Sequence, residues 1–103
     1  MPLKLILIRH CKSSWGAFDA DDHARVLNER GRAAAPLIGE WLSKRGHVPD
    51  EVLCSDAART QETWRRISGA MVIDAPINFS RALYLAPDMV MLEHLRKATS
   101  PTV

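Results

Sequence analysis

The most constraining feature of the sequence is an apolar run over residues 3–8 that ends abruptly at Arg9-His10. A continuous apolar run without alternation is typical of a strand buried on both faces, as in a parallel sheet. The run is far shorter than the roughly 20 residues that cross a bilayer. It carries one lysine and no small-residue cleavage site, so we interpret it as a strand rather than a signal peptide and expect a cytoplasmic protein.

A long irregular segment and a helix are expected next. Residues 11–27 lack hydrophobic periodicity and are rich in Ser, Asp and Gly, which predicts a loop of a length that is often functional. Asn28 is a plausible helix cap, and Gly46 suits the C-terminal stop of the same helix. Pro36 lies inside this segment, so we expect either a kink there or a regular part that starts a few residues earlier.

The second half repeats the alternation of strands and helices. We expect a short strand over residues 51–54, a second helix capped by Ser55 or Asp56, one or two strands within residues 71–79, and a third helix that starts near Pro87. The resulting order of strand, helix, strand, helix, strand, helix indicates a layered α/β fold.

Composition excludes several classes of protein. The chain has 103 residues, of which 47% are hydrophobic, so we expect one domain over residues 1–103. A net charge of +2 is too small to argue for nucleic acid or a membrane surface as a partner. Two cysteines make no disulfide framework, and four scattered histidines lack metal-ligand spacing, so we expect no metal and no cofactor.

Two polar motifs follow the first two expected strands. Arg9-His10 ends the first strand, and Ser55 to Arg59 follows the second, with Arg59 in the first turn of a helix. Right-handed crossovers make such strands parallel, and ligands of α/β sheets bind at the carboxyl ends of strands. If the two strands are neighbours, two arginines and a histidine converge on one point. Helix N-termini also collect phosphates, so the sequence predicts an anion site there.

The spacing of three segments resembles the histidine phosphatase superfamily, and most of all its phosphohistidine phosphatases of the SixA type. The segments are Arg9-His10-Cys11-Lys12-Ser13-Ser14-Trp15, Arg25-Val26-Leu27-Asn28-Glu29-Arg30-Gly31, and Ser55 to Thr63. The resemblance runs through the whole chain in order. It implies a phosphoglycerate mutase-like fold, which is a three-layer sandwich with a mainly parallel sheet flanked by helices.

The resemblance also implies roles for particular residues. The nucleophile would be His10, with Arg9 and Arg59 as paired phosphate-binding arginines in the catalytic centre. Arg25 would lie near the mouth of the phosphate site, and Ser55 would be a further phosphate-binding residue. No metal or cofactor is implied, and inorganic phosphate or sulfate would bind in the site.

The chain departs from the family pattern at three places. Cys11 stands where a Gly usually follows Arg-His, and Arg81-Ala82-Leu83-Tyr84 stands where many relatives carry a Glu general acid. The second family histidine, usually in a Gly-His-Asn segment on the next strand, has no counterpart before Val103. We therefore expect a domain that lacks its C-terminal part and, taken alone, turns over poorly.

The mechanism implied by the resemblance is covalent catalysis, in which His10 accepts the phosphoryl group and water then hydrolyses the phosphohistidine. A leaving imidazole has a near-neutral pKa and needs less acid assistance than an alkoxide, which favours a phosphohistidine protein over a small phosphate ester as substrate.

Three other interpretations stay open at this stage. A cysteine phosphatase needs five residues between its Cys and its Arg. Ala17 stands where Cys11 would need the Arg, and only four residues separate Cys54 from Arg59. A non-catalytic module that binds phosphate or a phospho-ligand through the same arginines is the stronger alternative. The third is an inactive fragment of the enzyme.

Overall fold

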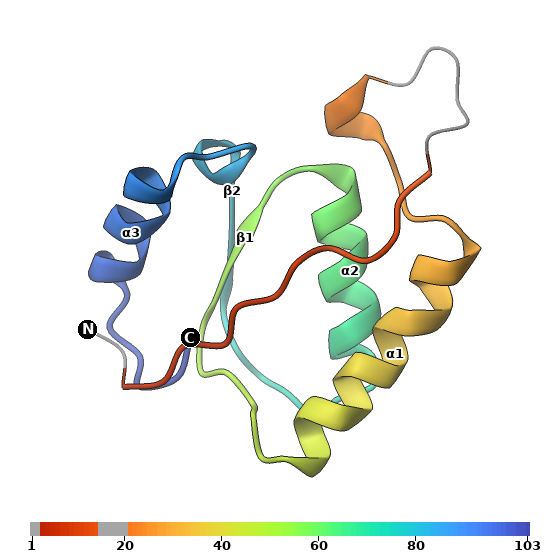
Figure 1. The fold of residues 1–103 in the computed structure, drawn as a ribbon. Coiled ribbons are helices and arrows are strands. Elements are labelled where there is room, and N and C mark those ends of the chain that lie inside the picture. Colours follow the sequence, from red (N-terminus) through yellow and green to blue (C-terminus); the bar gives the residue numbers. More distant parts are fainter. Residues whose placement is uncertain (1–2, 15–20) are drawn as a thin grey trace.

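The computed structural model describes residues 3–14 and 21–103, and Trp15 of the first motif lies outside these ranges. Figure 1 shows how the elements are arranged. In chain order they are the short 3-10 helix η1 (Asp22–Ala24), α1 (Glu29–Lys44), β1 (Val52–Ser55), α2 (Ala58–Ser68), β2 (Ile77–Ser80), the 3-10 helix η2 (Arg81–Leu83) and α3 (Asp88–Lys97). Helices and strands alternate from α1 to α3, as the sequence pattern predicts.

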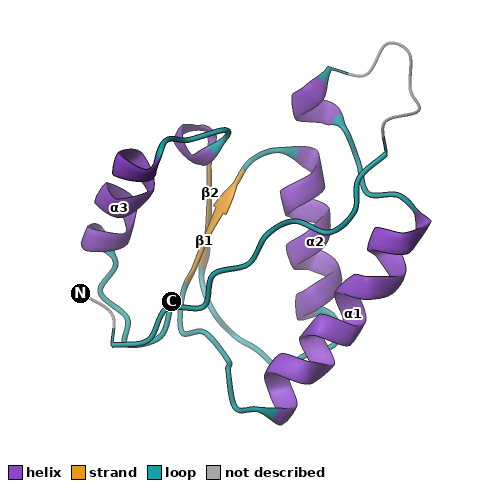
Figure 2. Ribbon diagram, in the orientation of Figure 1, coloured by secondary structure: helices purple, strands orange, loops and turns teal. Residues whose placement is uncertain are grey.

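The two strands form a parallel sheet that lies between two layers of helix. β1 and β2 pair from Val52↔Ile77 to Ser55↔Ser80, with α2 as the crossover between them. Helices α1 and α2 lie together on one side of the strands and α3 lies on the other (Figures 1 and 2). The prediction of a layered α/β fold with a parallel sheet is confirmed.

Helix α1 begins and ends where the sequence indicates. The side chain of Asn28 accepts a hydrogen bond of 3.0 Å from the amide of Gly31, which satisfies one free donor of the first turn. Gly46 has φ = +70°, the left-handed conformation that lets the chain leave a helix. The helix runs through Pro36, so the proline does not end it.

Close contact between α1 and α2 forms the main core. Ala35 and Leu42 of α1 and Ile67 of α2 are buried in one cluster with Leu27 and Met71; Cys11 completes it. Gly39 makes this contact possible, because a Cβ at that position would overlap the backbone carbonyl oxygen of Ile67. Nothing in the sequence pattern indicated the need for a glycine between these helices.

The expectation for residues 3–8 is wrong in its detail. These residues form no regular strand, and the exposed fractions of Leu3, Leu5 and Leu7 are 92%, 52% and 84%. A single parallel bridge joins Lys4 to Thr102. Within the described residues, no backbone hydrogen bond connects the segment to β1. An apolar run becomes a buried strand only when neighbours pair with both of its edges, and here one edge has a partner over its first residues alone.

The expected cap of α2 is also wrong. Ala57 occupies the N-cap position, and no side chain caps the helix. Ser55 instead lies two residues before the N-cap and accepts a hydrogen bond of 3.2 Å from the amide of Ala57. The hydroxyl of Thr60 donates back to the carbonyl oxygens of Ser55 and Ala57, which holds the strand-to-helix turn. A side chain in the first turn of α2, that of Thr60, therefore stabilises the turn between β1 and α2.

Candidate active site

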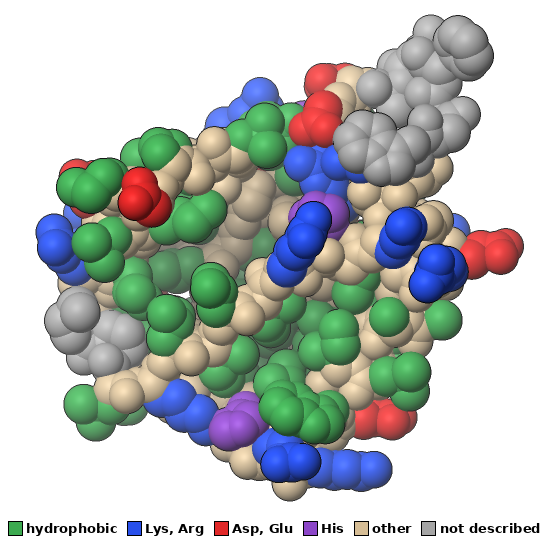
Figure 3. All heavy atoms as spheres, viewed as in Figure 1, with side chains coloured by type: hydrophobic (Ala, Val, Ile, Leu, Met, Phe, Trp, Pro, Cys, Tyr) green, Lys and Arg blue, Asp and Glu red, His purple; other side chains and the backbone are tan. Residues whose placement is uncertain are grey.

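A cavity of about 610 Å³ lies between the N-terminal segment, β1, α2 and α3. Its walls are mostly apolar, and Figure 3 views the hollowed face of the molecule on which apolar side chains gather. Four of the five predicted site residues, Arg9, His10, Ser55 and Arg59, line this one cavity. The predicted convergence of the two motifs is therefore present, although the segments that carry them are not paired neighbours.

The ring of His10 is held in a definite orientation. Its Nδ1 lies 2.7 Å from the backbone carbonyl oxygen of Cys11, which can only accept a hydrogen bond. Nδ1 must therefore carry the proton, and in the neutral ring Nε2 keeps its lone pair. The following backbone is held in turn, because the amide of Cys11 donates to the hydroxyl of Thr63 on α2 at 3.0 Å. His10 thus has the tautomer that a nucleophilic imidazole needs.

Arg59 is a buried cation in the first turn of α2. Only 6% of its side chain is exposed. Its Nη1 donates to the backbone carbonyl of Asp22 at 2.7 Å, and its Nη2 lies 3.2 Å from the Asp22 carboxylate. Its Nε is buried and has no hydrogen-bond partner among the described residues. A buried donor without a partner is costly, so this guanidinium has unused capacity for an anion in the cavity.

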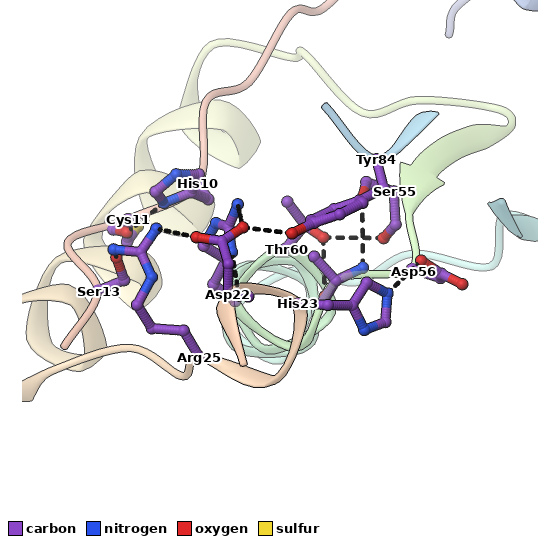
Figure 4. A network of polar contacts seen from close by, with 12 residues as sticks. His10, Cys11, Ser13, Asp22, His23, Arg25, Ser55, Asp56, Thr60 and Tyr84 are labelled. Carbon is purple, nitrogen blue, oxygen red and sulfur yellow. Dashed lines mark hydrogen bonds and ion pairs between the residues drawn. The ribbon is translucent and has the colours of Figure 1, made fainter. Parts of the chain in front are cut away.

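Asp22 is the centre of a polar network that joins η1 to η2 and α2 (Figure 4). Its carboxylate accepts a hydrogen bond from the hydroxyl of Tyr84 and lies 3.4 Å from Nη2 of Arg25. The bond from Tyr84, and then the charge and hydrogen bond of Arg59 and the charge of Arg25, outweigh desolvation and hold the pKa of Asp22 below its usual value. The same bond raises the pKa of Tyr84. Asp22 is therefore an anion at neutral pH and Tyr84 a neutral phenol.

The placement of Arg25 near the mouth of the phosphate site stays a prediction. Its guanidinium donates to the hydroxyl of Ser13 at 2.7 Å and contacts Asp22, and it is not among the residues that line the cavity. Its place beside Asp22 links it to Arg59 through one shared carboxylate. Arg25 therefore belongs to the polar network behind the site.

Neither cysteine is prepared for nucleophilic attack. Burial raises the pKa of the Cys11 thiol and also that of Cys54, whereas a reactive cysteine needs a lowered pKa. Both thiols are free. These environments argue against the cysteine phosphatase interpretation, in agreement with the unsuitable spacing to Arg59.

Sequence reasoning missed Asp22, His23 and Tyr84. Nε2 of His23 lies 2.6 Å from the carboxylate of Asp56, and its ring packs edge-on against Tyr84 with centroids 4.8 Å apart. These contacts tie η1 to the loop before α2 and to the residues that follow β2. The only available signal was the cluster Asp21-Asp22-His23 just before Arg25, within a loop already marked as functional.

Metal binding and membrane insertion find no support in the described part of the chain. Within residues 3–14 and 21–103, no group of three or more His, Cys, Asp or Glu side chains is placed to hold a metal ion. None of the helices described there is long and apolar enough to cross a membrane. The cytoplasmic location stays a prediction.

Comparison with known proteins agrees with this geometry. An uncharacterised chloroplastic protein of Arabidopsis thaliana is 36% identical over 101 residues, which are 94% of this chain but 46% of that protein. This chain therefore spans about half the length of that curated relative. The crystal structure of the "putative phosphohistidine phosphatase SixA" from Agrobacterium tumefaciens superposes with a TM-score of 0.89 at 29% identity, over 100% of this chain and 69% of that one.

A second solved structure shows the same fold. It is that of a "Putative Phosphohistidine Phosphatase SixA" from Nakamurella multipartitia, with a TM-score of 0.80 and 34% identity over 96% of this chain and 55% of that one. The family model of the histidine phosphatase superfamily (branch 1) matches residues 5–83, which include both motifs of the cavity. With most of its length matched by that model, the chain belongs to the histidine phosphatase superfamily.

Proposed function

We propose that this chain carries the nucleophile, His10, and the phosphate-binding Arg9 and Arg59 of a phosphohistidine phosphatase. The observation that carries the proposal is the placement of His10 and Arg59 on one cavity. His10 has Nδ1 engaged by a carbonyl, and Arg59 has a buried Nε without a partner. A free imidazole nitrogen and an unsatisfied cation are the two groups that phosphoryl transfer to histidine requires.

The reaction proceeds in two displacements. The lone pair of His10 Nε2 attacks phosphorus, the bond from phosphorus to the leaving nitrogen breaks, and that nitrogen takes up a proton from solvent. Water then attacks the phosphohistidine, the bond between phosphorus and Nε2 breaks, and inorganic phosphate leaves. Arg59 and Arg9 balance charge on the non-transferring oxygens, which is the main work in phosphoryl transfer. Ser55 lines the cavity beside them, and we propose that it contacts the phosphate.

The protonation states around Arg59 favour phosphohistidine as the substrate. An alkoxide leaving group needs a strong general acid, but Asp22 has a lowered pKa and Tyr84 a raised one. Neither group is therefore a good proton donor near neutral pH. An imidazole leaves with much less help because its own pKa lies close to neutrality. The substrate we propose is accordingly a phosphorylated histidine of a protein rather than a phosphate ester.

A phosphoenzyme trap tests the proposal. A peptide with labelled phosphohistidine is mixed with the chain and quenched in alkali, which preserves phosphohistidine. We expect label on the wild type and on His94→Ala, a matched control because His94 also lines the cavity. We expect none on His10→Ala. Label that survives in His10→Ala contradicts the assignment of the nucleophile, and turnover that EDTA abolishes and magnesium restores contradicts a metal-independent mechanism.

A second candidate function is a phosphate-binding module without turnover. It is favoured by the buried Nε of Arg59, which has no hydrogen-bond partner among the described residues and could hold an anion without any transfer to His10. Calorimetric binding of inorganic phosphate combined with no phosphoenzyme in the trap supports this candidate over the enzyme. We also propose that residues 1–103 form one folding unit in either case.

A further inference from the structure

An arginine outside the proposed catalytic centre lies at the same edge of the sheet. Arg81 is the first residue of η2 and directly follows Ser80, the last residue of β2. Ser80 pairs in register with Ser55, which lines the cavity. The carboxyl ends of parallel strands meet at one edge, where ligands of α/β sheets bind. Arg81 does not itself line the cavity, but Leu83 and Tyr84 of the same turn do, so it lies at the rim.

The ring of Tyr84 fixes the position of Arg81 relative to Arg59. The hydroxyl of Tyr84 donates to the carboxylate of Asp22, which holds the ring toward the polar network (Figure 4). Cζ of Arg81 lies 5.1 Å from the centroid of this ring, and Cζ of Arg59 lies 5.7 Å from the same centroid. Both distances are within the range of cation–π attraction. The two guanidiniums can therefore be no further apart than the sum of these distances.

Arg81 differs from Arg59 in having no carboxylate partner in the described part of the chain. Asp22 pairs with Arg59 at 3.2 Å, and Asp56 lies 2.6 Å from Nε2 of His23. Arg81 takes part in none of the ion pairs within residues 3–14 and 21–103. It is also exposed, so its guanidinium is open to a ligand at the rim.

We propose that Arg81 recognises an acidic side chain of the substrate protein, within about three residues of the phosphohistidine. The inference rests on the proposed function, because the phosphoryl group bound at Arg59 is what places the substrate. An extended peptide advances about 3.3 Å per residue, so about three residues cover the greatest separation that the two ring distances allow. A carboxylate matches the planar fork of a guanidinium, which can donate two parallel hydrogen bonds to it.

The charge at the rim favours a carboxylate over a second phosphate group. Arg81 offers one positive charge, and the nearest cation across the ring, Arg59, is shared with Asp22. A carboxylate carries one negative charge and is balanced by one guanidinium, whereas a phosphate group carries close to two at neutral pH. Arg81 would therefore select, among phosphohistidine proteins, those with an acidic residue beside the modified histidine.

A set of peptides tests the proposal. Each carries a stable phosphoryltriazole in place of phosphohistidine and has either Glu or Gln at one position, up to three residues away on either side. Calorimetry gives the Kd of each peptide, and of inorganic phosphate, for the wild type, Arg81→Gln and Arg81→Lys. Arg96→Gln is the matched control, because it removes the same charge from an exposed position in the last turn of α3, at the end remote from η2 (Figure 1).

The expected result is a preference for Glu that depends on Arg81. The wild type and Arg96→Gln should bind a Glu peptide about threefold to fivefold more tightly than its Gln counterpart, at one or more of these positions. Arg81→Gln should lose this preference but keep the wild-type affinity for inorganic phosphate. Arg81→Lys should keep part of the preference, because it retains the charge without the fork.

Two outcomes would overturn the proposal. One is no preference for Glu at any position in the wild type, or a preference that persists in Arg81→Gln. The other is an equal loss of affinity for Glu and Gln peptides in Arg81→Gln, because Arg81 would then only hold Tyr84 in place. The assay measures affinity and needs no turnover, so its failure is distinguishable from a failure of the phosphoenzyme trap.

Discussion

The carboxylate of Asp22 lies 3.2 Å from Nη2 of Arg59, and its backbone carbonyl accepts from Nη1 of the same guanidinium. Asp22 is 37 residues away from Arg59 in sequence. The arginine proposed to bind phosphate is thus already held by an anion of the protein itself. A bound phosphate must share this guanidinium with Asp22 or replace it.

The first prediction concerns this competition. We expect Asp22→Asn to bind inorganic phosphate about threefold to tenfold more tightly than the wild type, because the amide keeps the shape of the side chain but not its charge. Isothermal titration calorimetry measures the affinity. Asp21→Asn is the matched control, since this neighbour makes no side-chain cap or ion pair with the described residues. Unchanged or weaker binding in Asp22→Asn means that Asp22 orients Arg59 and does not compete with the anion.

A second prediction concerns the contribution of Arg59 itself. Arg59→Lys retains the charge but loses the planar set of donors, so phosphate affinity should fall by about tenfold, and Arg59→Ala should lose more. Arg30→Ala removes one positive charge from an exposed position of α1 and should change the affinity little. Calorimetric titrations of the variants at one salt concentration are the measurement. Equal affinities for the wild type and Arg59→Ala would remove Arg59 from the anion site.

A third prediction follows from Glu62, a buried carboxylate that ties three segments together. It accepts from the amide of Leu27 at 2.9 Å, and from Nε of Arg32 and Nε of Arg66 at 2.9 and 2.8 Å. Burial raises its pKa, but these hydrogen bonds and charges outweigh burial, so the net pKa is lowered from its ordinary 4.5. Glu62→Gln should cost about 1–3 kcal/mol of unfolding free energy at pH 7.

The pH dependence of this loss has a definite sign. A carboxyl with a lowered pKa in the folded state contributes stability above its unfolded pKa, and the contribution disappears as the pH falls through its folded value. The difference between wild type and Glu62→Gln should therefore be full at pH 7 and shrink below about pH 4.5. Urea unfolding across this range is the measurement, with the exposed Glu40→Gln as control. A difference that is independent of pH would show that the charge of Glu62 is not involved.

A fourth prediction uses the contact between α1 and α2. Alanine in place of glycine inside a helix usually stabilises it by up to about 1 kcal/mol. At Gly39 the added Cβ would overlap the carbonyl oxygen of Ile67, so Gly39→Ala should instead destabilise the protein by about 1–3 kcal/mol. Glu40→Ala, at the next and exposed position, is the control for propensity. A gain in stability for Gly39→Ala would mean that α1 and α2 can move apart to admit the Cβ without a loss of packing energy.

The local elements of this protein follow from its sequence. Asn28 caps α1, and Gly46 follows its end. Helical spacing also indicates core positions for Leu42 of α1 and Ile67 of α2, although Leu37 and Trp41, which share the apolar face of α1, are exposed. The signals are short-range, because caps and helical periodicity act between residues three or four positions apart. The order of helices and strands, with right-handed crossovers, also led to the shared position of His10 and Arg59.

The tertiary structure alone decided the remaining features. Tyr84 meets Asp22 across 62 residues of sequence, and no local pattern records such a contact. The apolar run at residues 3–8 looks like a buried strand in sequence, but a strand depends on hydrogen bonds to neighbours from elsewhere in the chain. Residues 101–103 supply those bonds only as far as Ile6. The sequence therefore identified the residues that we propose to carry the chemistry. Long-range pairing decided how far the sheet forms and which carboxylate of the protein contacts Arg59.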